Sequence, residues 1–243
     1  MWTRADLKDR AKQTLKGHYW TAFAASLVIA LFSGGGSGNA AGSAGEHLSD
    51  GSLQGLLQQP EYAAGFVVGA LIALTAGIGV IIFLAGPLEV GARRYFTSAC
   101  CRQYDLGNLG FAFRQGRYLN VVKAQLLRDI RTLLWSLLFI IPGIIKGYAY
   151  SMVPYILADN PYISPKRAIE LSCRMTDGHK FQIFELELSF IGWYLLGALA
   201  CGIGVVFVNP YHDSTMAELY MQLRHQALQN GTVTMEELCL VYN

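Results

Sequence analysis

The sequence predicts an all-α membrane protein. We expect a polytopic transmembrane helical bundle with four to six membrane segments, some of them broken or re-entrant helices, and with amphipathic interfacial helices beside them. Hydrophobic residues make up 53% of the 243 residues and charged residues only 15%, whereas about a quarter of an average soluble chain is charged. Uncharged apolar runs recur along the chain, and most lysine and arginine residues lie between them, as is typical of membrane proteins.

Residues 1–17 are expected to form an amphipathic interfacial helix. Thr3 is suited to cap its start and Gly17 to end it. The apolar side chains that recur every four residues are Leu7, Ala11 and Leu15. The adjoining stripe consists of Lys8, Lys12 and Lys16, which are candidate contacts to anionic lipid headgroups. An ordinary helix that packs on the bundle through its apolar side is an equal alternative.

Two apolar runs follow, separated by residues 34–61, an outer loop rich in Gly, Ser and Ala. The first run, residues 19–33, is short for a crossing, which needs about 20 residues. The second, residues 63–88, is comfortably long enough. Small residues recur every four positions within it, a pattern that lets two helices approach closely in lipid. These candidate helix-packing residues are Gly65, Gly69, Ala73 and Gly77.

The third and fourth apolar runs, residues 132–158 and 188–212, are interrupted by Pro, Gly or Lys. Each is either one kinked crossing or two half-helices folded back as a re-entrant hairpin, and counting residues does not decide between these. Lys146, with Pro142 and Gly143, is the candidate functional group inside the membrane, because a lysine in an apolar run is costly unless it meets protein, water or a headgroup. Its functional interpretation is a substrate or proton contact. The alternative is a side chain that snorkels or marks a hairpin turn.

Two further amphipathic helices are expected at residues 109–131 and 164–178. In the second, Ser164 followed by Pro165 is a start signal and Gly178 a stop signal. The basic residues on its polar side, a second set of candidate lipid-headgroup contacts, are Lys166, Arg167 and Arg174. We expect residues 1–225 to form a single integral membrane domain and residues 226–243 a C-terminal tail.

The distribution of charge predicts the orientation of the chain. Basic residues cluster before the first apolar run and after the second, whereas the segment between these runs has no Lys or Arg. By the positive-inside rule the N-terminus is cytoplasmic. An even number of crossings, or re-entrant hairpins, would also place the C-terminus in the cytoplasm.

The sequence carries no pattern typical of catalysis. No zinc-protease, nucleophile-elbow, P-loop or dinucleotide motif occurs, and the histidines lack ligand spacing. The five cysteines include no C-x-x-C pair and are interpreted as free thiols. We therefore expect no enzyme activity, no cofactor and no metal. A net charge of +2 also argues against a nucleic-acid partner.

Several stretches resemble a bacterial integral membrane family, that of domain-of-unknown-function nine seventy-five. One example is the run Ile141-Pro142-Gly143-Ile144-Ile145-Lys146. The stretches that carry the resemblance are residues 1–8, 17–20, 86–91, 141–146, 150–161, 178–180, 188–193, 202–204, 210–211 and 217–220. A more distant likeness is to the membrane domain of bacterial glycerophosphodiester phosphodiesterases, which implies re-entrant segments and a cytoplasmic C-terminus.

The family has no established reaction, so the resemblance implies fold and location. We expect a multi-pass protein of the bacterial cytoplasmic membrane that is a non-enzymatic scaffold or accessory protein in membrane maintenance or export. Its expected partners are membrane lipids with anionic headgroups, and other membrane proteins or further copies of itself. The alternative is a small transporter or channel component with a path lined by the broken helices around Lys146.

Overall fold

The computed structural model describes residues 2–32, 68–69, 71–73, 75, 77, 79–114, 116–199 and 203–240. Within these residues the chain is helical, with turns and no strands, so the all-α class is confirmed. The helices are α1 (Arg4–Leu15), α2 (Tyr19–Phe32), the π-helix η1 (Ile81–Ala85), α6 (Gly86–Cys100), the 3-10 helix η2 (Leu106–Phe113), α7 (Tyr118–Leu138), α8 (Ile140–Tyr150), α9 (Val153–Asp159), α10 (Pro165–Met175), α11 (Lys180–Leu199) and α12 (Ile203–Gln229). The predicted outer loop at residues 34–61 lies outside the described residues.

Helix α1 packs on the bundle through its apolar side. Leu7, Ala11 and Leu15 are buried, and α12 is the main helix that covers them. The side chain of Thr3 accepts a hydrogen bond from the backbone of Asp6, as a helix cap does. Gly17 has a φ of 85°, a conformation that ends the helix. The apolar stripe is thus covered by protein, which is the second of the two alternatives drawn from the sequence.

Helix α6 begins at the end of the second apolar run and extends beyond it to Cys100. The π-helix η1 precedes Pro87, which has no N–H to donate to the carbonyl group of Phe83 one turn earlier. The hydroxyl group of Tyr118 on α7 donates to that carbonyl instead, at 2.7 Å. A side chain added at Gly91 would collide with the backbone of Leu109. The glycine therefore lets η2 lie directly on α6.

The third apolar run folds back on itself as a helical hairpin formed by α7 and α8. Gly143 faces Ser136, and residues 147, 150 and 151 face residues 128, 129 and 132 on the opposite leg. The reversal is at Phe139, which has extended backbone angles. Pro142 lies in the first turn of α8, where a helix requires no N–H from it. The chain therefore reverses three residues before Pro142, and of the two alternatives for this run the described residues form the folded-back hairpin.

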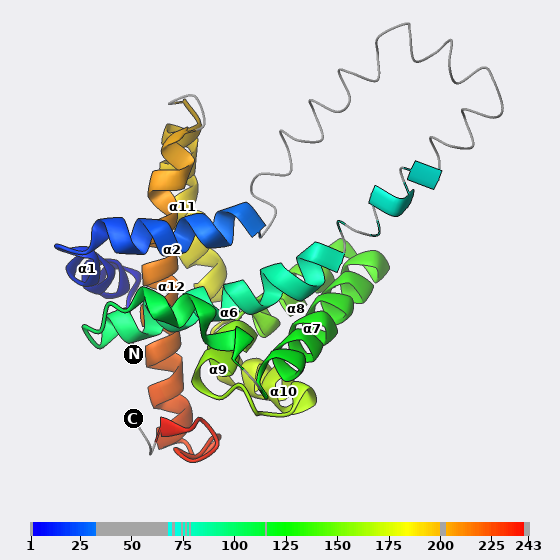
Figure 1. Ribbon diagram of the computed structural model, residues 1–243. Coiled ribbons are helices and arrows are strands. Elements are labelled where there is room, and N and C mark those ends of the chain that lie inside the picture. Colours follow the sequence, from blue (N-terminus) through cyan, green and yellow to red (C-terminus); the bar gives the residue numbers. More distant parts are fainter. Residues whose placement is uncertain are drawn as a thin grey trace, which may run out of the picture.

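The fourth apolar run forms a second hairpin, from α11 and α12. Gly197 and Gly204 meet backbone to backbone, and the hydroxyl group of Tyr194 is 3.4 Å from the side-chain oxygen of Asn209. Phe190 packs against His212 with ring centroids 5.2 Å apart. Residue numbers fall along α11 as they rise along α12, so the two helices pack antiparallel. The α11–α12 hairpin projects at the top of Figure 1, and α7 lies beside α8 at the right.

The predicted amphipathic helix at residues 109–131 was wrong at both ends. Residues 106–113 instead form η2, whose start is capped by Asp105 through a 2.8 Å hydrogen bond from the backbone of Gly107. Gly116 then turns with a φ of 83°, and α7 begins at Tyr118 and runs on to Leu138. The glycine-rich segment before Gly116 favours a short turn of helix over a long helix.

Helix α10 forms within the predicted segment, with Ser164 as its cap and the predicted stop Gly178 at a φ of 74°. Helix α12 continues to Gln229, so the expected tail from residue 226 begins inside a helix. The following residues pack on the bundle through the buried side chains of Val233 and Leu238. Among the described residues, no helix combines the length and the apolar composition needed to cross a membrane.

Candidate functional site

Four charged side chains form an ion-pair centre where α6, α7 and α12 meet: Asp213, which is buried, and Glu89, Arg93 and Arg128, which are partly buried. The guanidinium group of Arg93 is 2.7 Å from the carboxylate of Asp213 and 3.8 Å from that of Glu89. Arg128 is 3.3 Å from the other oxygen of Glu89. Since charges removed from water are costly unless paired, this alternation of signs compensates each charge at the junction of the three helices.

Neutral polar groups complete the hydrogen bonding of the two carboxylates. The hydroxyl group of Ser26 on α2 donates to Asp213 at 2.6 Å, and the amide of Gln125 on α7 donates to Glu89 at 3.1 Å. The imidazole of His212 lies 3.7 Å from Asp213. The centre thereby joins four helices that are distant in sequence.

The charges set the protonation state of the centre. Burial opposes ionisation of Glu89, but the guanidinium groups of Arg128 and Arg93 outweigh it and lower the pKa of Glu89. Burial likewise opposes ionisation of Asp213, and Arg93 outweighs it and lowers the pKa of Asp213. Both carboxylates are therefore charged at neutral pH. The ring of Tyr155 lies beside the centre, with the Arg93 guanidinium 5.2 Å from its centroid.

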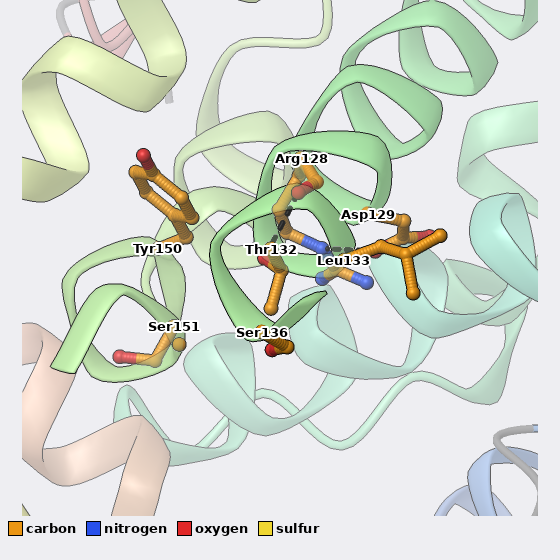
Figure 2. Close-up of a pocket in the computed structure, with 8 residues that line it drawn as sticks. Arg128, Asp129, Thr132, Leu133, Ser136, Tyr150 and Ser151 are labelled. Atoms are coloured by element: carbon orange, nitrogen blue, oxygen red, sulfur yellow. Dashed lines mark hydrogen bonds and ion pairs between the residues drawn. The ribbon is translucent and has the colours of Figure 1, made fainter. Parts of the chain in front are cut away.

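A groove of about 440 Å³ opens next to the centre, between the two legs of the α7–α8 hairpin. It is lined by Arg128, Asp129, Thr132, Leu133, Ser136, Gly147, Tyr150 and Ser151. Figure 2 shows Tyr150 and Ser151 on one side and the α7 side chains on the other, with Arg128 bonded to Asp129. Arg128 thus belongs both to the ion-pair centre and to the wall of the groove.

A second hollow, of about 530 Å³, is lined by residues of α1, α6, α12 and the C-terminal segment, among them Arg10, Cys100 and Glu218. Burial, reinforced by Glu218, raises the pKa of the Cys100 thiol well above its usual range. A protonated thiol is a poor nucleophile. In the described part of the chain, no three side chains converge as a metal site would require.

The comparisons with known proteins bear on the second half of the chain. Residues 137–227 match the family model described as "Protein of unknown function (DUF975)". The resemblance expected from the sequence is confirmed over these residues. No curated protein and no solved structure matches. The likeness to the membrane domain of glycerophosphodiester phosphodiesterases therefore stays a prediction, as does the family resemblance of residues 1–136.

Within the DUF975 match, a second buried network links α9 to α12. The hydroxyl group of Tyr220 donates to the carboxylate of Asp159 at 2.6 Å, and Arg224 pairs with the same oxygen at 2.9 Å. This network gives a structural reason for the Asp and Tyr residues in two of the stretches that carry the resemblance. The α11–α12 hairpin also lies within the matched residues.

Lys146, Pro142 and Gly143 all lie in the α7–α8 hairpin. The ammonium group of Lys146 is 5.2 Å from the ring centroid of Trp135 on the opposite leg, a cation–π contact. No carboxylate of the described residues lies within ion-pair distance of it. Gly143 permits the close approach to Ser136. These positions favour a structural interpretation, in which Lys146 packs along the hairpin with its charge on an aromatic ring.

The six candidate headgroup contacts differ in whether their charged groups already contact other residues of the protein. Lys8 donates to the backbone of Ser189 at 3.4 Å and lies over the ring of Phe190. Arg167 pairs with Glu237 at 2.6 Å. Lys12 and Arg174 pair with Asp9 and Glu170 on their own helices, while Lys16 and Lys166 are exposed. Lys8 and Arg167 therefore contact other parts of the protein, and Lys16 and Lys166 face outward.

The predicted packing stripe does not meet another described helix. Gly69, Ala73 and Gly77 are exposed, and a side chain added at Gly69 or Gly77 would find no described atom within 4 Å. Gly65 lies outside the described residues. This stripe stays a prediction for contacts with another chain.

One part of the ion-pair centre follows from helical spacing in the sequence, and the rest does not. The spacing of Glu89 and Arg93 indicates an i,i+4 pair, which the structure confirms. Asp213 and Arg128 were not singled out. A usable signal was available for Asp213, because it is the first charged residue after the uncharged run 188–212.

Proposed function

We propose that this chain is a membrane protein that enters the bilayer through its two helical hairpins and is a non-enzymatic scaffold or accessory protein in membrane maintenance or export. The observation that carries the proposal is the exposed apolar surface of the hairpins. Monomeric soluble proteins rarely expose large contiguous apolar patches.

The apolar surface of the α7–α8 hairpin is concentrated at its tip. Leu137 is 82% exposed. The other large exposed apolar residues around it are Leu133, Leu134, Leu138, Phe139, Ile141, Ile144 and Ile145. The sequence has no charged residue between Arg131 on α7 and Lys146 on α8, so charge occurs only toward the base of the hairpin. This distribution suits a hairpin whose tip lies in lipid and whose base lies among headgroups.

The α11–α12 hairpin has the same distribution. Leu199, the last residue of α11, is 83% exposed. The other large exposed apolar residues of this hairpin, from Leu188 onward, are Leu188, Ile191, Trp193, Leu195, Leu196 and Phe207. Glu185 and Glu187 mark the point on α11 where charge begins.

The length of each tip supports entry into one leaflet. From Arg131 to Phe139 the chain rises about 12 Å, and from Glu187 to Leu199 about 18 Å. The hydrocarbon core of a bilayer is about 30 Å thick. Each hairpin therefore reaches into the core without crossing it, and the backbone groups along its two helical legs are hydrogen-bonded within helices. Both hairpin bases would then lie on one face, which we propose is the cytoplasmic face because of its basic residues.

Acidic substitutions at the tips test membrane entry. We expect the double variant Leu137→Asp, Leu199→Asp to leave the membrane fraction during alkaline extraction, because each carboxylate costs about 3 kcal/mol at the centre of an apolar segment. The matched control is Leu119→Asp, at an exposed leucine near the base of α7. Retention of the double variant at the control level would contradict the proposal.

The role itself is tested in cells. Deletion of the gene is expected to raise membrane permeability to a charged dye or to reduce the yield of exported protein. The wild-type chain and Leu119→Asp should restore both, and the double tip variant should not. A deletion strain with unchanged permeability and unchanged export would contradict the proposed role.

A further inference from the structure

The groove in the α7–α8 hairpin is a wedge that opens from the tip toward the base. Near the tip the legs touch, because a side chain added at Gly143 would lie 2.6 Å from the Cα atom of Ser136. One turn later Gly147 faces open space, with no atom within 4 Å of an added Cβ. The two legs of the hairpin are thus in contact at Gly143, near the tip, and are separated at Gly147 by a groove of about 440 Å³.

The walls of the groove carry four hydroxyl groups, two of which have already used their hydrogen-bond donor. Hydroxyl groups line it from Thr132, Ser136, Tyr150 and Ser151. Thr132 and Ser151 already donate to the carbonyl groups of Arg128 and Tyr148, at 2.9 Å and 2.8 Å. Their remaining capacity is to accept. A ligand that donates hydrogen bonds suits these walls.

The charged residues of the groove also favour a ligand that donates hydrogen bonds. Asp129 at its edge is 59% exposed, although one of its oxygens accepts from Arg128. The guanidinium group of Arg128 is shared between Asp129 and Glu89. Glu89 is also paired with Arg93, so Asp129 is the carboxylate of this group that is exposed at the groove, beside the Arg128 guanidinium. Such a surface is complementary to a ligand with a terminal cation and an adjacent anion.

Apolar side chains extend the groove toward the tip of the hairpin. Leu133 lines the groove itself, and Leu137 lies one turn farther along α7. Both are strongly exposed. A ligand in the groove would therefore have a polar end near Asp129 and an apolar end along Leu133 and Leu137, which is the chemistry of a phospholipid.

We infer that this groove binds one phospholipid whose headgroup ends in a primary ammonium group, as in phosphatidylethanolamine. The ammonium group donates to Asp129 and to the hydroxyl oxygens, the phosphate accepts from Arg128, and an acyl chain lies along Leu133 and Leu137. A choline headgroup has no N–H to donate, and a glycerol headgroup has no cation. The inference rests on the proposed membrane location, which brings lipid to the groove.

Lipid selectivity in detergent tests the inference. Purified full-length protein is titrated with phosphatidylethanolamine, phosphatidylcholine and phosphatidylglycerol of identical acyl chains, and bound lipid is counted by native mass spectrometry. We expect the wild type to prefer phosphatidylethanolamine about tenfold, as for a hydrogen bond to a charged group. Asp129→Asn should remove this preference, and Gly147→Leu, which fills the groove, should remove bound lipid.

Matched controls separate the groove from general effects. Asp177→Asn changes a more exposed carboxylate elsewhere, and Gly192→Leu adds the same side chain at a glycine of α11 that also faces open space. Both should bind lipid like the wild type. Circular dichroism checks that each variant keeps its helix content, and Asp129→Asn decides the question if Gly147→Leu does not fold.

The outcomes distinguish this inference from the proposed function. Equal binding of the three lipids by wild type, or an unchanged preference in Asp129→Asn, would overturn the groove assignment even for a protein that stays in membranes. A protein that prefers phosphatidylethanolamine in detergent but leaves membranes on alkaline extraction would overturn the proposed location and keep the groove.

Discussion

At the scale of single residues, the fold depends on charges that are buried in pairs. Arg93 and Asp213 are 120 positions apart, yet their side chains meet at 2.7 Å in a site that also holds Glu89 and Arg128. Removal of one partner of a buried pair typically costs about 3–5 kcal/mol, because it leaves the other charge without compensation. The arrangement therefore specifies which helices meet.

Neutralising Asp213 should destabilise the protein strongly. We expect Asp213→Asn to lower the free energy of unfolding by about 3 kcal/mol, because Arg93 keeps only the more distant carboxylate of Glu89. The control Asp177→Asn, at an exposed carboxylate, should change it by less than about 0.5 kcal/mol. Chemical unfolding in detergent micelles, followed by circular dichroism, measures both. Equal values for the two variants would show that the centre does not stabilise the fold.

Acid should destabilise the protein through the same carboxylates. The pKa values of Glu89 and Asp213 are lowered in the folded chain. Their contribution to stability is therefore full above the ordinary carboxyl pKa of about 4, and it is lost as the pH falls through the lower folded values. We expect the melting temperature to hold down to about pH 4 and to drop as the pH falls below that value, with a smaller drop in Asp213→Asn. A melting temperature that does not change over this range would contradict the assignment.

At the scale of helices, local signals were predictable and chain reversals were not. Thr3 and Ser164 are caps, Gly17 and Gly178 are stops, and all four act through neighbours within a few residues. The hairpins depend on the fit between two legs. The sequence marks Pro142 as a break, but proline fits the first turn of a helix, so it does not fix where the chain turns.

The candidate site was predictable only where it was local. The pair of Glu89 and Arg93 follows from helical spacing. Its extension to Arg128 and Asp213 depends on tertiary packing between distant segments, and no pattern within a short window specifies it. The groove between α7 and α8 likewise appears only once the third apolar run is known to fold back.

The contact between Gly197 and Gly204 predicts opposite effects for two similar substitutions on α11. A Cβ atom at residue 197 would lie 2.7 Å from the backbone of Gly204, so Gly197→Ala should force the hairpin legs apart and destabilise the protein by about 1–3 kcal/mol. Gly192 faces open space, and Gly192→Ala should stabilise the helix by about 0.5–1 kcal/mol. Unfolding measurements on both variants check the sign. A stabilised Gly197→Ala would rule out the close approach.

At the scale of the whole molecule, polar and apolar surfaces are separated. The charged residues of the centre are buried or partly buried where α6, α7 and α12 meet, whereas large apolar side chains are exposed at the tips of two hairpins. A globule in water would favour the reverse arrangement. We interpret this inversion as the adaptation of a chain whose hairpins lie in lipid and whose centre lies near the headgroups.

The depth of the hairpin tips in a bilayer is the direct measure of whether they lie in lipid. A polarity-sensitive fluorescent probe is attached to Leu137→Cys, Leu199→Cys or Leu119→Cys in a background without other cysteines, and the protein is reconstituted in vesicles. Quenchers placed at known depths on lipid chains then locate each probe. We expect lipids with deep quenchers to quench the probes at 137 and 199, and only quenchers near the headgroups to quench the probe at 119. Equal quenching of all three probes from the aqueous phase would contradict it.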